Sequence, residues 1–210
     1  MTKTFSFLFI ILIFISCGKS AENGSSSSGD SVTLSEVTSS SPVPSAALNF
    51  DVNLKFDNLN SQQEDKLNLA ADKIKKVIAS ERFKNAILNF TYNGKKTFVD
   101  NLGLSNAQVY KKIIEGSEKL NPGVDNTMNL EVQVYSASTN VVGYTLPNVV
   151  KIWMNLKYLN ATSASGATTN MVHEWLHKLG FGHAQTSNPS RPYSVPYAVG
   201  YLVGRLANGV

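Results

Sequence analysis

The three histidines of this 210-residue chain all lie within one stretch of 11 residues, His173 to His183, which reads HEWLHKLGFGH. His173 and His177 are four residues apart, a spacing that places both imidazoles on one face of a helix. Gly180 follows where such a helix must end, because glycine reaches the left-handed conformation that reverses the backbone. The chain can then bring His183 back toward the other two. The stretch therefore predicts a helix, a turn and a returning loop.

Three neutral imidazoles in this arrangement can hold one Zn²⁺ and leave its fourth position open for water, which is typical of catalytic rather than structural zinc sites. Residues 175–210 contain no Asp or Glu, so from that side only His183 can complete the ligand set of His173 and His177. Glu174 follows the first ligand directly. It is the candidate general base that takes a proton from zinc-bound water and passes it to the leaving amine.

The pattern HExxHxxGxxH resembles the signature of the metzincin metallopeptidases. Trp175, Leu179 and Phe181 supply the bulky apolar residues of the family's fuller pattern. The resemblance implies an α+β fold, with a twisted mixed β-sheet, a backing helix, an active-site helix and a small C-terminal subdomain. A helix predicted at about 62–82 suits the backing role, and residues 167–179 suit the active-site helix.

Metzincins carry a methionine in a tight turn beneath the zinc, whereas no Met follows Met171 in this chain. We expect the equivalent turn at residues 192–197, with Val195 or Pro196 beneath the metal. A tyrosine just after this turn serves some relatives as a transient zinc ligand or oxyanion donor. Tyr197 is the candidate for that role, and the alternative is a tyrosine packed in the core.

The chain before residue 160 independently predicts an α+β domain with a mixed sheet. Apolar and polar residues alternate from Leu48 to Phe56, which predicts a half-buried strand. Ser61 and Glu64 form a capping box at the start of the 62–82 helix. Asn93-Gly94 predicts a hairpin turn between strands at 86–90 and 97–99.

Four further elements are expected along the chain. They are a helix capped by Ser105 and Gln108 with an apolar stripe that reaches Leu120, a strand at 130–134, a strand at 149–156, and a short helix after Pro196. By the family resemblance, the strand at 149–156 is the sheet edge along which substrate binds. The alternative is an interior strand of the sheet.

The N-terminus predicts export. Residues 1–16 read as a signal peptide, because their apolar run is too short to span a membrane as a stable helix. The alternative is a membrane-anchor helix. Residues 14–17 resemble the lipobox of bacterial lipoproteins, which implies that Cys17 is lipidated and anchors the protein to a membrane. Residues 17–47 predict a flexible tether, or alternatively a pro-segment acting through Asp30. The zinc domain is then 48–210. By resemblance to lipoproteins, Gly18 after the lipidated cysteine favours a location at the outer membrane or cell surface.

A formal net charge of +4 spread along the chain gives no reason to expect nucleic-acid binding. The single cysteine cannot close an intramolecular disulfide, so packing must stabilise the fold, and a bound metal is the further contribution to consider. We expect a monomeric, lipid-anchored zinc metalloendopeptidase that hydrolyses proteins or peptides at the cell surface or in the periplasm. The alternative is a catalytically inactive, zinc-stabilised lipoprotein that binds a partner at the surface.

Overall fold

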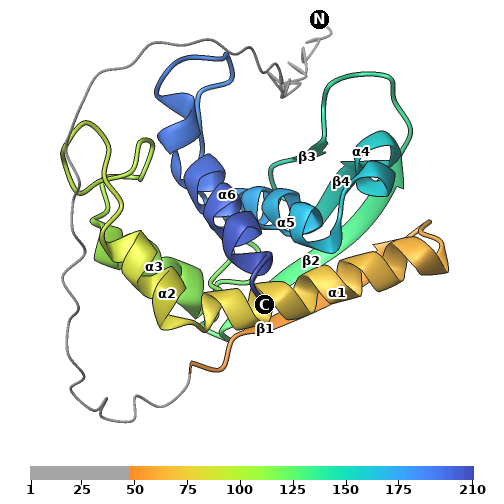
Figure 1. The fold of residues 1–210 in the computed structure, drawn as a ribbon, viewed down its shortest axis with the longest axis horizontal. Coiled ribbons are helices and arrows are strands. Elements are labelled where there is room, and N and C mark those ends of the chain that lie inside the picture. Colours follow the sequence, from red (N-terminus) through yellow and green to blue (C-terminus); the bar gives the residue numbers. More distant parts are fainter. Residues whose placement is uncertain (1–47) are drawn as a thin grey trace, which may run out of the picture.

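The computed structural model describes residues 48–210, which form an α+β domain around a mixed four-stranded sheet (Figure 1). The strand order is β1-β2-β4-β3. The strands are β1 Asp51–Asp57, β2 Thr127–Tyr135, β3 Gly143–Thr145 and β4 Lys151–Asn155. The first, second and fourth of these are parallel, and β3 runs antiparallel to β4 at the edge. The predicted α+β class and mixed sheet are therefore confirmed.

One face of the sheet is apolar and covered by helices, and the other carries charged and polar side chains together with the rings of Tyr135, Tyr144 and Trp153. Met128, Leu130 and Val132 alternate along β2 with half-exposed polar residues, as expected for a sheet buried on one side. On the polar face, Lys151 pairs with both Asp57 and Glu131, at 2.8 and 2.9 Å. The domain core, and with it the candidate site, therefore lies on the single apolar face.

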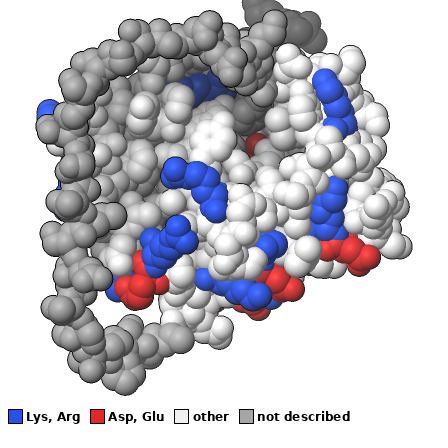
Figure 2. Space-filling view, in the orientation of Figure 1, with Lys and Arg blue, Asp and Glu red and all other residues white. Residues whose placement is uncertain are grey.

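Helix α1 (Ser61–Ile78) packs against β1 and is buried along one stripe (Figure 1). Its capping box uses Asn60 and Gln63, one residue before the predicted pair Ser61 and Glu64. On the face drawn in Figure 2, several basic side chains lie next to acidic ones. In this region Lys75 of α1 pairs with Asp51 of β1, at 2.8 Å.

The predicted hairpin at 86–99 is wrong, and so is the extension of the first helix to residue 82. A second helix, α2 (Glu81–Leu88), is N-capped by Ser80, whose hydroxyl accepts a hydrogen bond from the backbone N–H of Phe83. Phe83 and Ile87, one helical turn apart, are both fully buried, so core packing stabilises a helix there. Asn93-Gly94 forms a local turn closed by the bridge between Tyr92 and Lys95, without flanking strands.

Helix α3 (Asn106–Glu115) has the predicted capping box of Ser105 and Gln108 but ends earlier than its predicted stripe. Gly116 terminates it in the left-handed conformation, so Leu120 lies outside the helix and is 49% exposed. The strand predicted at 149–156 is β4, an interior strand, which confirms the second of the two alternatives. The edge is β3, which the sequence patterns did not predict. A short helix, α4 (Leu156–Ala161), follows β4.

Helices α5 (Ala164–Lys178) and α6 (Val195–Ala207) pack closely against each other and carry the candidate site (Figure 1). Gly200 and Gly204 face α5, where an added Cβ would lie 2.9 Å from the Thr169 carbonyl oxygen and 2.0 Å from the Thr169 hydroxyl, respectively. Only small residues on α6 allow this approach.

Within the described part of the chain, no helix has the length and apolar character needed to cross a bilayer. The predicted signal peptide, Cys17 and tether lie outside the described residues.

Candidate metal centre

Two of the three histidines lie on α5, and the third follows the turn that ends it. His173 and His177 occupy successive turns of the helix, as their spacing predicted. Gly180 then takes a φ of +98°, and the backbone of Phe181 hydrogen-bonds to the Leu176 carbonyl at 3.1 Å. This reversal directs His183 back toward α5. The structure thus brings together all three predicted ligands.

The three imidazoles converge through their Nε2 atoms. The Nε2 atom of His173 lies 3.3 Å from that of His177 and 3.2 Å from that of His183. A tetrahedral zinc with Zn–N bonds of 2.0–2.1 Å places its ligand nitrogens about 3.3–3.4 Å apart. These two separations therefore match two edges of a zinc tetrahedron.

In His177 and His183 the other ring nitrogen fixes the tautomer. His177 Nδ1 donates to the Phe181 carbonyl at 2.8 Å, and His183 Nδ1 donates to the Ala184 carbonyl at 3.0 Å. The His173 side chain hydrogen-bonds to the backbone of Pro196. Because each Nδ1 of His177 and His183 carries its proton, the two Nε2 lone pairs face His173 Nε2. Lone pairs this close repel one another unless a cation lies between them, so the donor set fits a metal ion.

The electrostatics of the site keep the ligands neutral. Burial lowers the pKa of His177 to about 4, and it is also the main cause of the lowered pKa values of His173 and His183. The neighbouring imidazoles further lower the pKa of His173, and Arg191 further lowers those of His173 and His183. At neutral pH these side chains are therefore uncharged, which is the form that binds a metal.

Glu174 is fully buried beside this cluster. Its Oε1 accepts a hydrogen bond from Asn170 Nδ2 at 3.4 Å, and its Oε2 has no hydrogen-bond partner among residues 48–210. Burial raises the pKa of this carboxyl to about 8, although the ammonium of Lys178 opposes the shift. In the metal-free fold this carboxyl is therefore mostly protonated at neutral pH. A divalent cation held by the three histidines would favour its ionised form, in which the unpartnered oxygen can accept a proton from a molecule bound next to it.

The ring of Tyr197 packs against the histidine cluster. Its ring centroid lies 4.5 Å from that of His173 and 4.8 Å from that of His183, and the guanidinium of Arg191 stacks on the ring at 4.9 Å. The ring of Tyr197 therefore packs against the imidazoles, and the backbone of Pro196 hydrogen-bonds to His173. Val195 and Pro196 are both buried, and the placement of one of them beneath the metal stays a prediction. Burial raises the pKa of the Tyr197 hydroxyl, so it remains a protonated donor.

Sequence reasoning missed three residues that support the centre. Asn170 lies one helical turn before Glu174, so helix spacing could have identified it. Glu118 accepts the indole proton of Trp175 at 2.7 Å from a loop 57 residues away. Lys178 Nζ donates to the Lys151 carbonyl at 3.1 Å and to the Thr145 hydroxyl, tying α5 to the β3–β4 connection. Nothing in the local sequence indicates these last two contacts.

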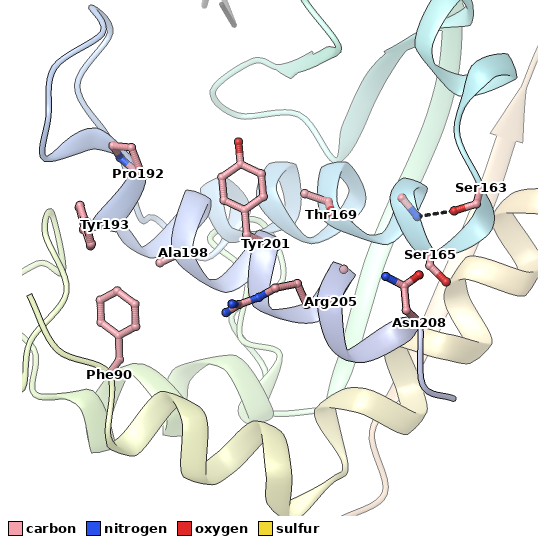
Figure 3. Close-up of a pocket in the computed structure, with 12 residues that line it drawn as sticks. Phe90, Ser163, Ser165, Thr169, Pro192, Tyr193, Ala198, Tyr201, Arg205 and Asn208 are labelled. Carbon is pink, nitrogen blue, oxygen red and sulfur yellow. Dashed lines mark hydrogen bonds between the residues drawn. The ribbon is translucent and has the colours of Figure 1, made fainter. Parts of the chain in front are cut away.

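A groove of about 540 Å³ runs along α5 and α6, and neither the three histidines nor Glu174 line it. Figure 3 shows Tyr201 and Arg205 projecting from α6 along it, with Phe90 and Tyr193 at one end and Ser163 at the other. The Tyr201 ring lies 6.1 Å from that of Tyr197, centroid to centroid, so the groove borders Tyr197 without covering the imidazoles.

Comparison of the chain with protein-family models gave no match, and no curated protein matched it. The geometry of the site therefore carries the functional argument.

Proposed function

We propose that this protein is a zinc-dependent metalloendopeptidase of the metzincin type. The observation that supports this most directly is the convergence of three neutral imidazoles, His173, His177 and His183, at tetrahedral spacing beside the buried carboxylate of Glu174. A closed structural zinc site has a fourth protein ligand and needs no buried carboxylate next to it. The same observation therefore favours an enzyme over the inactive binding lipoprotein.

In this proposal the three histidines hold Zn²⁺. Zinc bound there supplies a Lewis acid and lowers the pKa of bound water toward about 7. Glu174 Oε2, which has no partner among the described residues, accepts the proton of the attacking water, and the same carboxyl returns it to the leaving amine. Tyr197 keeps its proton and lies next to two ligands, so it is the proposed oxyanion donor.

An extended polypeptide is the substrate that fits the sheet edge. β3 is the last strand of the sheet in residues 48–210, so one side of its backbone has no strand partner there. Gly143 on β3 lies against Asn170 of α5, so this edge borders the site. A peptide paired along β3 would therefore pass beside Glu174. The metzincin resemblance implies the same mode of binding.

Anchoring of the enzyme through lipidated Cys17, after export, remains part of the proposal. It would restrict substrates to proteins and peptides on the outer side of the inner membrane. Because the tether of residues 17–47 is rich in Ser and poor in large apolar residues, it would allow the domain to reach substrates near the membrane surface.

The test compares the purified wild-type protein with Glu174→Gln, His183→Ala and a control, Glu64→Gln, on α1. We expect one zinc per wild-type molecule by elemental analysis, and cleavage of a proteome-derived peptide pool that a chelator abolishes. Glu174→Gln should bind zinc fully and lose at least about 10³-fold in turnover, His183→Ala should bind zinc weakly, and Glu64→Gln should match the wild type. Zinc-loaded wild-type protein that cleaves no peptide would favour the binding lipoprotein instead.

A further inference from the structure

Asn170 is a buried polar side chain that stability alone does not explain. It is 8% exposed and lies among apolar residues of α5 such as Ala167 and Met171, which are almost fully buried. Its Nδ2 donates to Glu174 Oε1 at 3.4 Å, while its Oδ1 is buried without a hydrogen-bond partner in the described chain. A buried, half-satisfied amide destabilises a fold relative to an apolar side chain of the same shape. This arrangement therefore indicates a role beyond packing.

The backbone of the edge strand holds this amide in place. A Cβ added to Gly143 of β3 would lie 2.5 Å from Asn170 Oδ1 and 3.0 Å from its Nδ2, and 2.8 Å from the carbonyl oxygen of Trp153. No side chain fits at Gly143 without displacing the amide, because real Cβ contacts are essentially never this short. Asn170 is thus confined between β3 on one side and Glu174 on the other.

We propose that Asn170 is a positioning residue, which rests on the proposed peptidase function, and that Gly143 provides the space for it. The Asn170 amide binds one carboxylate oxygen of Glu174, which leaves Oε2 as the oxygen directed at the reacting water. Glu174 has no other hydrogen-bond partner among residues 48–210, so Asn170 alone fixes the rotation of its carboxylate by hydrogen bonding. Hydrogen bonds of this length in a ligand-free site commonly shorten when substrate is bound.

The first test removes the donor while keeping the volume. Asn170→Leu should lower kcat about ten- to hundredfold, because errors of about 1 Å in positioning cost up to that much, while KM and zinc content stay within about twofold of the wild type. Asn85→Leu on α2, an exposed asparagine on a helix away from the site, is the matched control and should leave all three unchanged. A zinc-loaded Asn170→Leu variant with wild-type kcat would overturn the proposal.

A second variant approaches the same contact from the sheet. Gly143→Ala should displace the amide and lower kcat to the same extent, whereas Gly123→Ala, where an added Cβ meets nothing within 4 Å, should not. The double variant of Gly143→Ala with Asn170→Leu should lose no more than the larger single loss, because both act through one hydrogen bond. Additive losses would show that the two residues act independently, which contradicts the proposal.

A spectroscopic measurement separates this proposal from the proposed function. In the zinc-loaded protein, the side-chain amide protons of Asn170 should exchange slowly and resonate downfield, and Glu174→Ala should shift them. This NMR signal reports the contact whether or not peptide is cleaved. Wild-type protein without turnover would refute the peptidase, whereas amide signals that do not respond to Glu174→Ala would refute the positioning role of Asn170.

Discussion

Replacing the buried carboxyl of Glu174 by an amide should stabilise the metal-free protein at alkaline pH. Glu174 is fully buried, and one of its oxygens has no hydrogen-bond partner in residues 48–210. Its ionised form is therefore poorly solvated in the fold, which is why burial raises its pKa from 4.5 to about 8. Gln has nearly the same shape and never ionises, so Glu174→Gln removes this cost while keeping the packing.

The sign and the size follow from the two pKa values. A carboxyl whose pKa is raised in the folded state favours folding below its unfolded pKa, and this contribution is lost as the pH rises toward the folded pKa. The difference between about 8 and 4.5 is worth about 5 kcal/mol at about 1.4 kcal/mol per pH unit. Between about pH 5 and pH 8.5 the advantage of Glu174→Gln should therefore grow by about 4 kcal/mol. The histidines, whose pKa values are lowered, and Glu118 are present in both proteins, so their contributions cancel in the difference.

Urea unfolding of chelator-treated protein measures this difference. The free energies of unfolding of wild type and Glu174→Gln should be similar near pH 5 and diverge steadily toward pH 8.5, with Glu64→Gln following the wild type throughout. A constant gap across this range, or a less stable Glu174→Gln at pH 8.5, would refute the argument that burial opposes ionisation of Glu174.

Three other outcomes are expected. Gly180→Ala should lower the free energy of unfolding by about 1–3 kcal/mol, because the residue has a φ of +98°. Gly182→Ala, where the added Cβ meets open space, should change the free energy of unfolding by less than about 0.5 kcal/mol, and chemical denaturation measures both values. Trp175→Phe removes the 2.7 Å hydrogen bond to buried Glu118 and should lower the free energy of unfolding by about 1.5–3 kcal/mol. Trp153→Phe should lower it by about 1 kcal/mol, because this half-buried indole donates to the neutral amide of Gln133. A smaller loss for Trp175→Phe would contradict this ranking. Zinc at about 1,000 times its Kd should stabilise the fold by about 4 kcal/mol, so a melting temperature that a chelator leaves unchanged would argue against binding to the folded state.

The local parts of the site could be predicted from the sequence because they depend on spacing within one helix and one turn. His173 and His177 are related by helix periodicity, and Gly180 marks the turn that returns His183. The α+β class could be predicted because segments with strand periodicity and segments with helix periodicity follow one another along the chain. Those predictions need only neighbouring residues.

The remaining features depend on contacts between distant segments. Residues 81–88 form a helix because Phe83 and Ile87 enter the core, and this packing overrides the hairpin signal of Asn93-Gly94. The edge strand β3 has only three residues, too few for a period to be recognised. Glu118 reaches Trp175 across 57 residues, which no local pattern encodes. These features appear only once the chain is folded.

The close approach of α6 to α5 limits how this protein can change over evolutionary time. An added Cβ at Gly200 would lie 3.3 Å from the Cβ of His173, so even a methyl group would press on the helix turn that carries a candidate metal ligand. Substitutions on this face of α6 are therefore restricted to the smallest residues. The loop after His183 has mostly exposed residues, so we expect sequence variation to accumulate there instead.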